Sequence, residues 1–381
     1  MSSSLTRFKS PHTSFAHAVE FGDWKVFVPG PVRIESHLLA IGNQQLPYNR
    51  TEAFSEITHE IQIGLLQLFQ TEGSVALLTA SGTAAMEAAA INFLDDSTKV
   101  LVVNGGTFGQ RWSDLCTVHS IPFEELCVPP GADIDLSQLE SILLKGRFSA
   151  LLINAHETST GHLYDIEAIG KIVRTHGCLF VVDAISSICA DPFTMDAWGV
   201  DVCILSSQKA LALPPGLSFV ALNRRSVALL EKRKPKSLYF NLKDYLANQL
   251  RGQSPYTPAI GLMLQLHQRL ADIQSQTLPV LVAQHKQRAE HFRHAIQDLA
   301  FAVFPSRCSN AMTALACEGM DAGQVVERLR DHYRIIVAPG AGSLKSKTIR
   351  VAHMGAQNPN DVGFLTQALA EINATSRRTK R

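Results

Sequence analysis

The sequence predicts an α/β fold, in which a mostly parallel sheet is covered by helices on both faces and is followed by a smaller C-terminal α+β domain. Apolar runs of strand length alternate with helical segments between residues 75 and 222. Strands that are apolar on both faces are typical of parallel sheets buried between two layers of helices. After residue 275 the strands are shorter and alternate with helices in the pattern of an α+β domain. A length of 381 residues is enough for two domains. We therefore expect an N-terminal arm at 1–25, a large domain at 26–275 and a small domain at 276–381.

The expected elements follow from local patterns taken in chain order. Apolar residues at helical spacing between Ile57 and Phe69 predict an amphipathic helix over 52–69. Ser81-Gly82-Thr83 separates a strand from an alanine-rich helix that starts at residue 84, with Ser81 as the candidate N-cap. The other strands of the large domain are expected at 75–80, 99–104, 150–155, 178–184, 200–207 and 218–222. Its other helices are expected at 110–118, 165–175 and 260–273. In the small domain, helices are expected at 278–299, 323–332 and 360–372, and strands at 302–304, 313–317, 334–337 and 348–352.

The composition indicates a protein that acts on small molecules. With 35 basic and 34 acidic residues the net charge is +1, which favours neither nucleic acid nor a membrane surface as a partner. No apolar run reaches the roughly 20 residues that span a bilayer. The seven cysteines include no C-x-x-C pair, so we expect no metal site and a reducing, cytoplasmic location. The leader has no acid before Glu20, a composition that suits either an organelle transit peptide or an arm against a partner subunit.

A lone lysine follows one of the buried strands. The apolar run from Val202 to Leu205 leads into Ser206-Ser207-Gln208-Lys209, and Pro214-Pro215-Gly216 then prevents a regular continuation. Taking an ammonium group out of water costs several kcal/mol, roughly 2–7, unless the group is paired or loses its charge. An amine that forms a Schiff base with a carbonyl avoids this cost. The alternative is an ordinary lysine in a surface loop.

Two further groups are expected at the same edge of the sheet. Asp183 ends an apolar run, where its carboxylate either needs a cation or a bound proton as partner or caps the segment that follows. Ser81-Gly82-Thr83 lies where a strand meets a helix N-terminus, which suits a phosphate group as well as simple capping. The chain contains neither a P-loop nor a G-x-G-x-x-G fingerprint. A carboxylate for the pyridine nitrogen and a lysine for the aldehyde are together the pair that pyridoxal 5'-phosphate (PLP) requires.

These motifs resemble the class V, fold type I PLP-dependent aminotransferases, in particular the alanine–glyoxylate, serine–pyruvate and 2-aminoethylphosphonate branch. The resemblance runs from Pro29-Gly30-Pro31 to the last helix. It implies that Lys209 carries PLP as a Schiff base and that Asp183, in Val182-Asp183-Ala184-Ile185, contacts the pyridine nitrogen. The other cofactor contacts that it implies are Ser81, Gly82, Thr83 and Gln208 at the phosphate, Thr158 beside the phenolic oxygen, and Phe108 on the ring. Relatives usually carry Trp where Phe108 stands, but a phenyl ring still stacks.

The resemblance also predicts the substrate side and the share of a partner subunit in the site. Arg350, in Thr348-Ile349-Arg350-Val351, is expected to bind the substrate carboxylate bidentately, with a structural salt bridge as the alternative. The backbone at Gly30, and Tyr48 or Arg50, are expected to line the substrate side. The residues expected to reach the neighbouring subunit's phosphate are Tyr256 and Thr257, with Ser254 as the alternative to either.

The expected activity is transfer of an amino group from a small amino acid, such as alanine or serine, to a small 2-oxo acid, either pyruvate or glyoxylate. The resemblance further implies a homodimer with its active sites at the subunit interface. A 2-aminoethylphosphonate–pyruvate transaminase is the alternative within the branch. A cysteine desulfurase of the same fold needs a mobile cysteine and typically a histidine where Gln208 stands. A non-catalytic binding protein would have no use for an intact Lys209 and Asp183.

Overall fold

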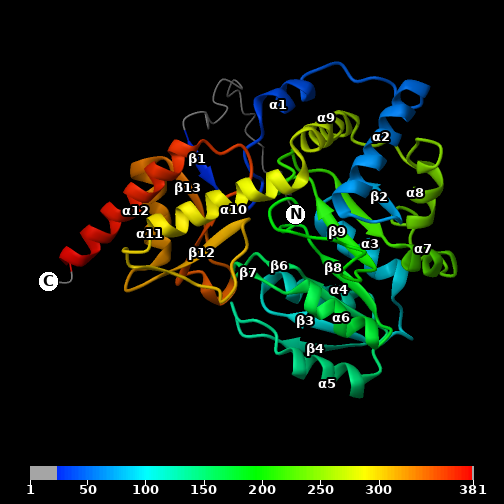
Figure 1. Cartoon of the computed structure of the whole chain (residues 1–381), viewed down its shortest axis with the longest axis horizontal. Helices are drawn as coiled ribbons and strands as arrows, with labels where there is room; N and C mark the ends of the chain where they lie inside the picture. Colours follow the sequence, from blue (N-terminus) through cyan, green and yellow to red (C-terminus); the bar gives the residue numbers. More distant parts are fainter. Residues whose placement is uncertain (1–23, 380–381) are drawn as a thin grey trace, which may run out of the picture.

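The computed structural model describes residues 24–379 and contains two main sheets with the helices that pack against them (Figure 1). The predicted N-terminal arm lies outside the described residues except for its last two positions. The larger sheet and its helices form one half of the molecule, and the C-terminal elements form the other. The helix α10 (Leu278–Ala295) crosses from one half to the other in this view.

The larger sheet has seven strands and is mostly parallel, as the sequence predicts. In spatial order it consists of β2 (Ser74–Leu78), β10 (Ser218–Leu222), β9 (Val202–Ser206), β8 (Leu179–Asp183), β5 (Ala150–Asn154), β3 (Val100–Asn104) and β4 (Phe123–Cys127). The strands from β9 to β4 pair in parallel, whereas β10 is antiparallel to both of its neighbours. The carboxyl ends of β3, β5, β8 and β9 therefore meet at one edge, and the residues of the candidate site follow them.

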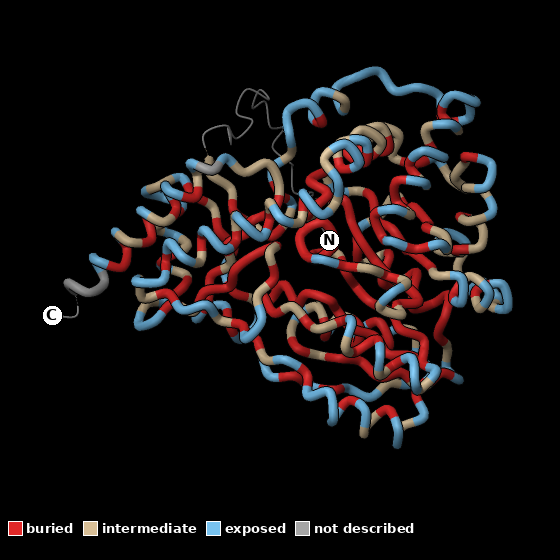
Figure 2. The backbone as a smooth tube through the Cα atoms, in the orientation of Figure 1, coloured by how far each residue is buried: buried red, intermediate tan, exposed pale blue. Residues whose placement is uncertain are grey.

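Both faces of this sheet are buried, which explains why its strands read as continuous apolar runs. Along β5, Leu151 and Ile153 pack in one core cluster, whereas Leu152 between them packs in a second cluster on the other face. Figure 2 shows the strands as a buried layer, with most exposed residues on the outer helices and loops. The helices around the sheet are α1 (Ser36–Gly42), α2 (Glu52–Phe69), α3 (Gly82–Phe93), α4 (Thr107–Val118), α5 (Leu136–Gly146), α6 (Ile166–Thr175), α7 (Arg224–Glu231), α8 (Leu242–Gln249) and α9 (Ile260–Gln276).

Several of these elements were not predicted, and β4 shows why. It lies at the edge of the sheet, and Glu124 and Glu125 in its centre are exposed. An edge strand needs no continuous apolar run, because only one side pairs and the other meets solvent. The helices α1, α5, α7 and α8 were also missed. For α5 a usable signal existed, because Asp135 caps it by accepting hydrogen bonds from the N–H groups of Ser137 and Gln138.

The smaller sheet has five strands and contains one that the sequence analysis assigned to the wrong domain. Its spatial order is β1 (Lys25–Phe27), β13 (Ile335–Pro339), β14 (Thr348–Ala352), β12 (Met312–Cys317) and β11 (Phe301–Val303). The strand β1 pairs in parallel with β13, and Phe27 is buried in the core of this half, so the large domain does not begin at residue 26. Long-range pairing at a sheet edge leaves no mark in the local sequence. The boundary near residue 275 stays a prediction.

The remaining elements complete the C-terminal half and add one hairpin to the large one. The helices α11 (Ala322–Tyr333) and α12 (Pro359–Thr379) accompany α10, and a 3-10 turn, η2 (Gly342–Leu344), precedes β14. The hairpin formed by β6 (His156–Glu157) and β7 (His162–Leu163) follows β5. Its turn holds Thr158 at the site edge of the large sheet.

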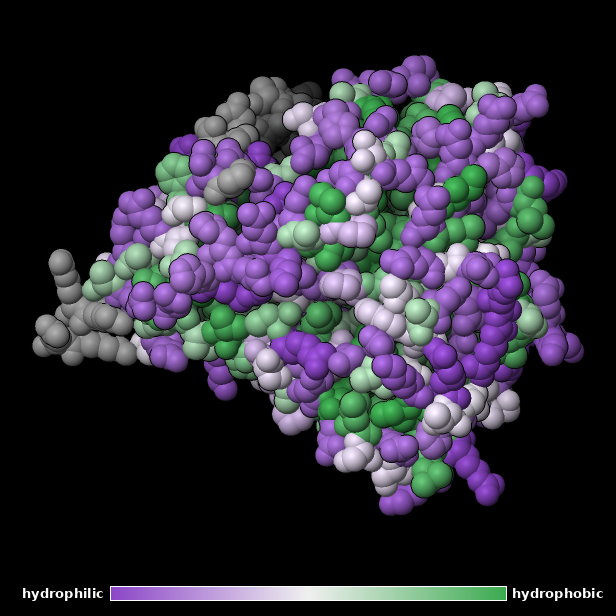
Figure 3. Space-filling view, viewed as in Figure 1, coloured by the Kyte–Doolittle hydropathy of each residue, from purple (hydrophilic) through white to green (hydrophobic). Residues whose placement is uncertain are grey.

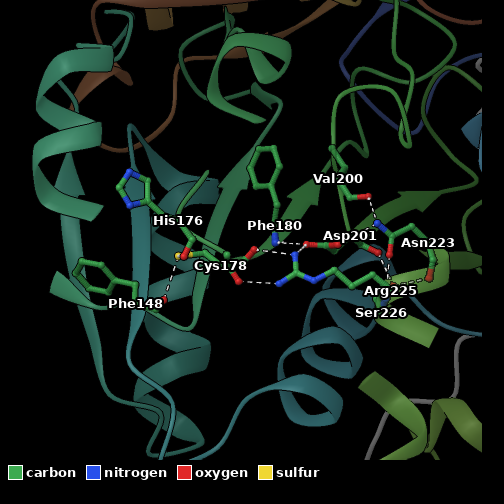
Figure 4. A network of polar contacts seen from close by, with 10 residues as sticks. Phe148, His176, Cys178, Phe180, Val200, Asp201, Asn223, Arg225 and Ser226 are labelled. Atoms are coloured by element: carbon green, nitrogen blue, oxygen red, sulfur yellow. Dashed lines mark hydrogen bonds and ion pairs between the residues drawn. The ribbon is translucent and has the colours of Figure 1, made fainter. Parts of the chain in front are cut away.

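A compact polar cluster lies at the opposite, amino-terminal edge of β8 and β9 (Figure 4). The buried Asp201 carboxylate accepts hydrogen bonds from the N–H of Phe180 at 2.8 Å and from the amide of Asn223 at 2.9 Å. Arg225 pairs with the same carboxylate at 2.9 Å and also donates to the carbonyl oxygens of Gly177 and Cys178. This cluster ties the start of α7 to two strands and is complete without a ligand.

The outer surface carries mixed side chains. Figure 3 shows hydrophilic residues interspersed with hydrophobic ones over both halves on the face in view. Among the described residues, no helix combines the length and the apolar character that crossing a membrane requires.

Candidate active site

The site is built where two adjacent parallel strands end. Asp183 is the last residue of β8, and Lys209 follows β9 in the turn after Ser206. The register of the pair sets Asp183 opposite Ile204, so the two strands deliver a carboxylate and an amine to the same edge. This is the arrangement that the sequence predicts from the strand ends alone.

Lys209 is confined by the segment that contains Gly30. Its Nζ donates a hydrogen bond to the carbonyl oxygen of Pro29 at 2.6 Å. A Cβ on Gly30 would lie 2.7 Å from Lys209 Cδ and 2.8 Å from Nζ, and the φ of +130° at Gly30 also disfavours a side chain. Burial lowers the pKa of Lys209 to about 8, while the nearby charge of Asp183 acts in the opposite direction. A substantial fraction of the amine is therefore neutral, and nucleophilic, near pH 8.

Asp183 is only 5% exposed and is held by two donors. The N–H of Ile185 donates to one carboxylate oxygen at 2.8 Å, and the amide of Asn154 donates to the other at 2.9 Å. Burial raises the pKa of Asp183 to about 6, and the charges of Arg111 and Lys209 oppose this rise. Since Asp183 and Lys209 each affect the pKa of the other, they share one electrostatic environment.

The first turn of α3 and the side chain of Gln208 both carry polar groups without a hydrogen-bond partner among the described residues. Ser81 occupies the N-cap position, but its side chain makes no capping hydrogen bond, contrary to the role considered from the sequence. Helix geometry leaves the N–H groups of Gly82 and Thr83 without a partner inside the helix. A Cβ on Gly82 would lie 2.5 Å from Ile185 Cδ1, so this turn packs directly against the segment after Asp183. The Oε1 atom of Gln208 is buried without a hydrogen-bond partner among the described residues.

The first turn of α4 carries Phe108 and is fixed by a buried carboxylate. Glu157, 1% exposed, accepts hydrogen bonds from the N–H of Gly109 at 2.9 Å and from the N–H of Phe108 at 3.3 Å. The guanidinium of Arg111 lies 4.8 Å from the centre of the Phe108 ring and donates to Thr83 Oγ1 at 3.0 Å. The aromatic ring is thereby linked to the α3 turn through a cation.

The smaller sheet contributes Arg350 from β14. Its Nη1 donates to the carbonyl oxygen of Thr158 at 3.1 Å, and its Nε donates to the carbonyl oxygen of Pro339 at 2.9 Å. Burial lowers the pKa of Arg350, and the negative charge of Glu157 opposes that effect. No carboxylate pairs with Arg350 among the ion pairs of residues 24–379, so the structural salt bridge that the sequence left open is not found there. The charge of Arg350 remains available to an anion.

The segment predicted to serve a partner subunit makes none of these contacts itself, although the N–H of Ala259 just after it donates to Thr79 Oγ1, two residues before Ser81, at 3.0 Å. The hydroxyl of Tyr256 donates to the carbonyl oxygen of Leu238 at 2.8 Å, and its ring stacks on Tyr239 at 5.1 Å. Ser254 and Arg50 belong to the same region, because Arg50 donates to the Ser254 carbonyl oxygen at 3.0 Å. The structure therefore groups Arg50 and Tyr256 near one surface, without linking them to Lys209 through these hydrogen bonds. The neighbouring residues Tyr48 and Thr257 are both exposed.

Some residues at the site were not singled out from the sequence. Asn154 could have been found, because it ends β5 beside Asp183 and the rule of strand ends applies equally to it. Arg111, Glu157, His156 and Ser186 carry no local signal, since their partners are distant in sequence. A cleft of about 560 Å³ lined by residues that include Arg111, Ser159 and Gly342 opens on one side of this cluster. A groove of about 680 Å³ between α10 and α12 contains none of the candidate residues.

The chemistry of this set fits PLP. The site offers an amine whose pKa is lowered, a buried carboxylate that forms no ion pair within the described part of the chain, and N–H groups at a helix N-terminus that have no partner inside the helix. These groups complement, in that order, an aldehyde, a protonated pyridine nitrogen and a phosphate. The aromatic ring of Phe108 lies on the element next to them.

The fold and this site define a PLP-dependent enzyme, and comparison with known proteins identifies its family. The aminotransferase class-V family matches residues 42–362, so the chain belongs to the class-V aminotransferases, which depend on PLP. It is 32% identical to a protein of Synechococcus sp. named soluble hydrogenase, small subunit, over 92% of this chain and 94% of that one. It is 30% identical to the L-aspartate–glyoxylate aminotransferase of Paracoccus denitrificans, over 87% and 86% of the two chains. The crystal structure of an alanine–glyoxylate aminotransferase from Nostoc sp. superimposes with a TM-score of 0.87 at 28% identity, covering 92% of this chain and 95% of that one.

Proposed function

We propose that this aminotransferase moves the amino group of a small amino acid, such as alanine or serine, to pyruvate or glyoxylate. The observation that carries the proposal is that two adjacent parallel strands deliver Lys209 and Asp183 to one buried sheet edge, where the charge of each affects the pKa of the other. Glyoxylate as acceptor is supported by two of the relatives described above, whose names contain it. Arg350, which pairs with no carboxylate of residues 24–379, supports a substrate that carries a carboxylate.

The proposed roles of the chain's own groups follow from their positions. Bound PLP supplies an electron-withdrawing ring that makes the proton on the substrate Cα acidic. Lys209 holds the cofactor aldehyde and then, as a free amine, moves the proton from the substrate Cα. Asp183 keeps a proton on the pyridine nitrogen, since a carboxylate buried at this depth favours a cationic partner. Phe108 covers the ring, and Arg350 orients the substrate by its carboxylate.

The phosphate contacts are part of the same proposal. Ser81, Gly82 and Thr83 offer the free end of α3, and Gln208 offers a side chain whose Oε1 is unpartnered among the described residues. An amide with one uncommitted end can turn its N–H₂ group toward a phosphate oxygen. Thr158 is proposed to lie beside the phenolic oxygen, and the Gly30 backbone to line the substrate side.

We also infer that the enzyme works as a homodimer in which Tyr256 and Thr257, or Ser254, reach the phosphate site of the other subunit. Exposed apolar side chains near this segment support the inference: Leu238 is 79% exposed and Leu250 is 84% exposed. Exposed apolar side chains mark a partner surface when they lie together in one patch. Light scattering of the purified protein should give the mass of two chains, and a monomer that binds PLP and catalyses the reaction would contradict the proposed homodimer.

The seven cysteines are all free, which supports a cytoplasmic location.

The test of the proposed function is spectroscopic and kinetic. Purified protein loaded with PLP should show the visible absorbance band of the bound cofactor. Adding a suitable amino donor in the absence of a 2-oxo acid should make that band disappear. We expect Lys209→Ala to lose that band and at least about 10³-fold in turnover, because the amine both holds the aldehyde and moves the proton. Full activity of Lys209→Ala would refute the proposal.

The same donor screen separates the alternatives. Discharge by 2-aminoethylphosphonate but not by alanine or serine would favour the phosphonate transaminase. Sulfide release from cysteine would indicate a desulfurase. Against the latter, burial raises the pKa of the Cys308 thiol, and it raises that of Cys317 to about 12, so neither is prepared as a thiolate nucleophile.

A further inference from the structure

Three side chains beside the candidate site form a continuous chain of hydrogen bonds. His156 Nδ1 lies 3.0 Å from Ser186 Oγ and 3.1 Å from the Ser186 carbonyl oxygen. Ser186 Oγ lies 2.7 Å from Thr158 Oγ1. His156 is 2% exposed, and Thr158 and Ser186 are each 4% exposed. The chain therefore runs through the protein interior from an imidazole to the hydroxyl of Thr158.

The partners determine where the protons lie. A carbonyl oxygen can only accept, so the Nδ1 of His156 carries a hydrogen and donates it to Ser186. Burial lowers the pKa of His156 to about 3, so the imidazole stays neutral and its tautomer does not change over the working pH range. Ser186 Oγ accepts from the imidazole, and its own hydrogen has two acceptors in reach, Thr158 Oγ1 at 2.7 Å and the His156 carbonyl oxygen at 3.4 Å. We assign the hydrogen to the shorter contact, with Thr158. The hydrogen of the Thr158 hydroxyl then points away from Ser186.

The chain ends next to the reacting groups. Burial is the main cause of the lowered pKa of His156, and the charges of Lys209 and Arg350 act in the same direction. Arg350 holds Thr158 by its carbonyl oxygen, while Ser186 holds it by its hydroxyl. Ser186 belongs to the turn that follows Asp183, so one segment positions both the carboxylate and the middle of the chain. Thr158 is thus fixed from two sides.

We propose that His156 and Ser186 are positioning residues that make the Thr158 hydroxyl a hydrogen-bond donor toward the phenolic oxygen of bound PLP. The proposal rests on the function proposed above and extends it to two residues beyond the proposed cofactor contacts. Each donor in such a chain polarises the next and strengthens its hydrogen bond. A donor to the phenolic oxygen stabilises the anionic form of that oxygen, so bound PLP loses its proton at a lower pH than it would without the donor. A histidine that only fills the core would have no such effect.

The test is a pH titration of the visible absorbance of the PLP-loaded protein, measured without substrate. Ser186→Ala removes the middle hydroxyl but leaves the backbone carbonyl that His156 also contacts. We expect the midpoint of the titration to rise by about half a pH unit or more, since the Thr158 hydroxyl is then neither polarised nor oriented. His156→Leu should shift the midpoint in the same direction by a smaller amount.

Ser187→Ala is the matched control. Ser187 is adjacent and equally buried, but its hydroxyl donates to the carbonyl oxygen of Ala184 and takes no part in the chain. The titration midpoint of Ser187→Ala should stay at the wild-type value. The melting temperatures of Ser186→Ala and Ser187→Ala show whether each variant is folded.

The double variant Thr158→Val with Ser186→Ala makes the test specific. If the effect of Ser186 passes through Thr158, the midpoint of Thr158→Val should not move further when Ser186 is also replaced. An unchanged midpoint in Ser186→Ala, or an equal shift with and without Thr158, would overturn the proposal. A wild-type protein that shows no PLP band would instead refute the proposed function, so the two failures can be told apart.

Discussion

The two ends of strands β8 and β9 carry similar buried carboxylates with different partners. Asp201, directly before β9, is 2% exposed, and Asp183, at the end of β8, is 5% exposed. At Asp201, two neutral donors and the guanidinium of Arg225 satisfy the carboxylate (Figure 4). At Asp183, two neutral donors are present but no ion pair is found among the described residues. Burial raises the pKa at both positions, to about 6 at Asp183.

The difference fits a structural role for Asp201 and the cofactor-binding role proposed for Asp183. A buried carboxylate needs its charge compensated, and the chain provides the compensating cation at the amino-terminal edge of the sheet. At the carboxyl-terminal edge, Asp183 forms no ion pair among the described residues, although the charges of Arg111 and Lys209 affect its pKa. In the proposed function a protonated pyridine nitrogen supplies a cationic partner for Asp183, at the edge where parallel sheets bind their ligands.

Replacing Asp183 with Asn should give the largest contrast between the two ends. We expect turnover to fall by about 10²–10⁴-fold, because an amide cannot keep a proton on the pyridine nitrogen. Steady-state kinetics of the PLP-loaded variant would measure this loss. The equivalent isosteric change Asp201→Asn is the control, and activity lost equally in both variants would show that the two ends do not differ in function.

The same Asp183→Asn change should stabilise the PLP-free protein at neutral pH. The folded-state pKa of Asp183 is raised from 3.8 to about 6, so the folded protein holds this proton more tightly than the unfolded chain does. The ionised carboxylate therefore costs stability that grows as pH rises from about 4 to 6, by about 2–3 kcal/mol in total. Urea unfolding at pH 7.5 and pH 4 would test this: the stabilisation should be present at the former and absent at the latter.

Asp201→Ala should behave in the opposite way. Its removal leaves the buried N–H of Phe180 and one side of Arg225 without an acceptor, which should destabilise the protein by about 2–4 kcal/mol. Urea unfolding measures the loss, and kcat/KM per folded molecule should equal that of the wild type. A selective fall in kcat/KM without a change in stability would contradict the structural role.

The smallest effect is expected from Arg225→Gln. The Arg225 side chain is 52% exposed, so solvent screens its charge and the pair contributes only about 1 kcal/mol. The difference in unfolding free energy between this variant and the wild type should shrink further in high salt. A loss as large as that of Asp201→Ala would show that the arginine, rather than the neutral donors, accounts for the stability of the cluster.

Much of the fold could be predicted because each local pattern agreed with the tertiary structure. The helix over 52–69 was predicted with the limits that the structure gives, and the buried strands of the large sheet were recognised from their unbroken apolar runs. The edge strand β4 and the strand β1 were missed or assigned to the wrong half, because edge pairing depends on a partner elsewhere in the chain. The site also contains residues of both kinds. Asp183 and Lys209 could be predicted because they stand at strand ends, whereas Glu157 and Ser186 could not, because their partners are distant in sequence.

The sequence alone determined which chemistry the chain can carry out. The local features are an amine and a carboxylate at the ends of apolar strands and a helix start rich in small residues. Burying an unpaired amine or carboxylate costs free energy, so such groups indicate a bound ligand. Only the tertiary structure decided which groups adjust that chemistry. It brings Arg350 from the second sheet to Thr158, places Arg111 over Phe108, and joins His156 to Thr158 through Ser186. Those contacts depend on distances of a few ångströms between segments far apart in the chain, and no local pattern of residues specifies them.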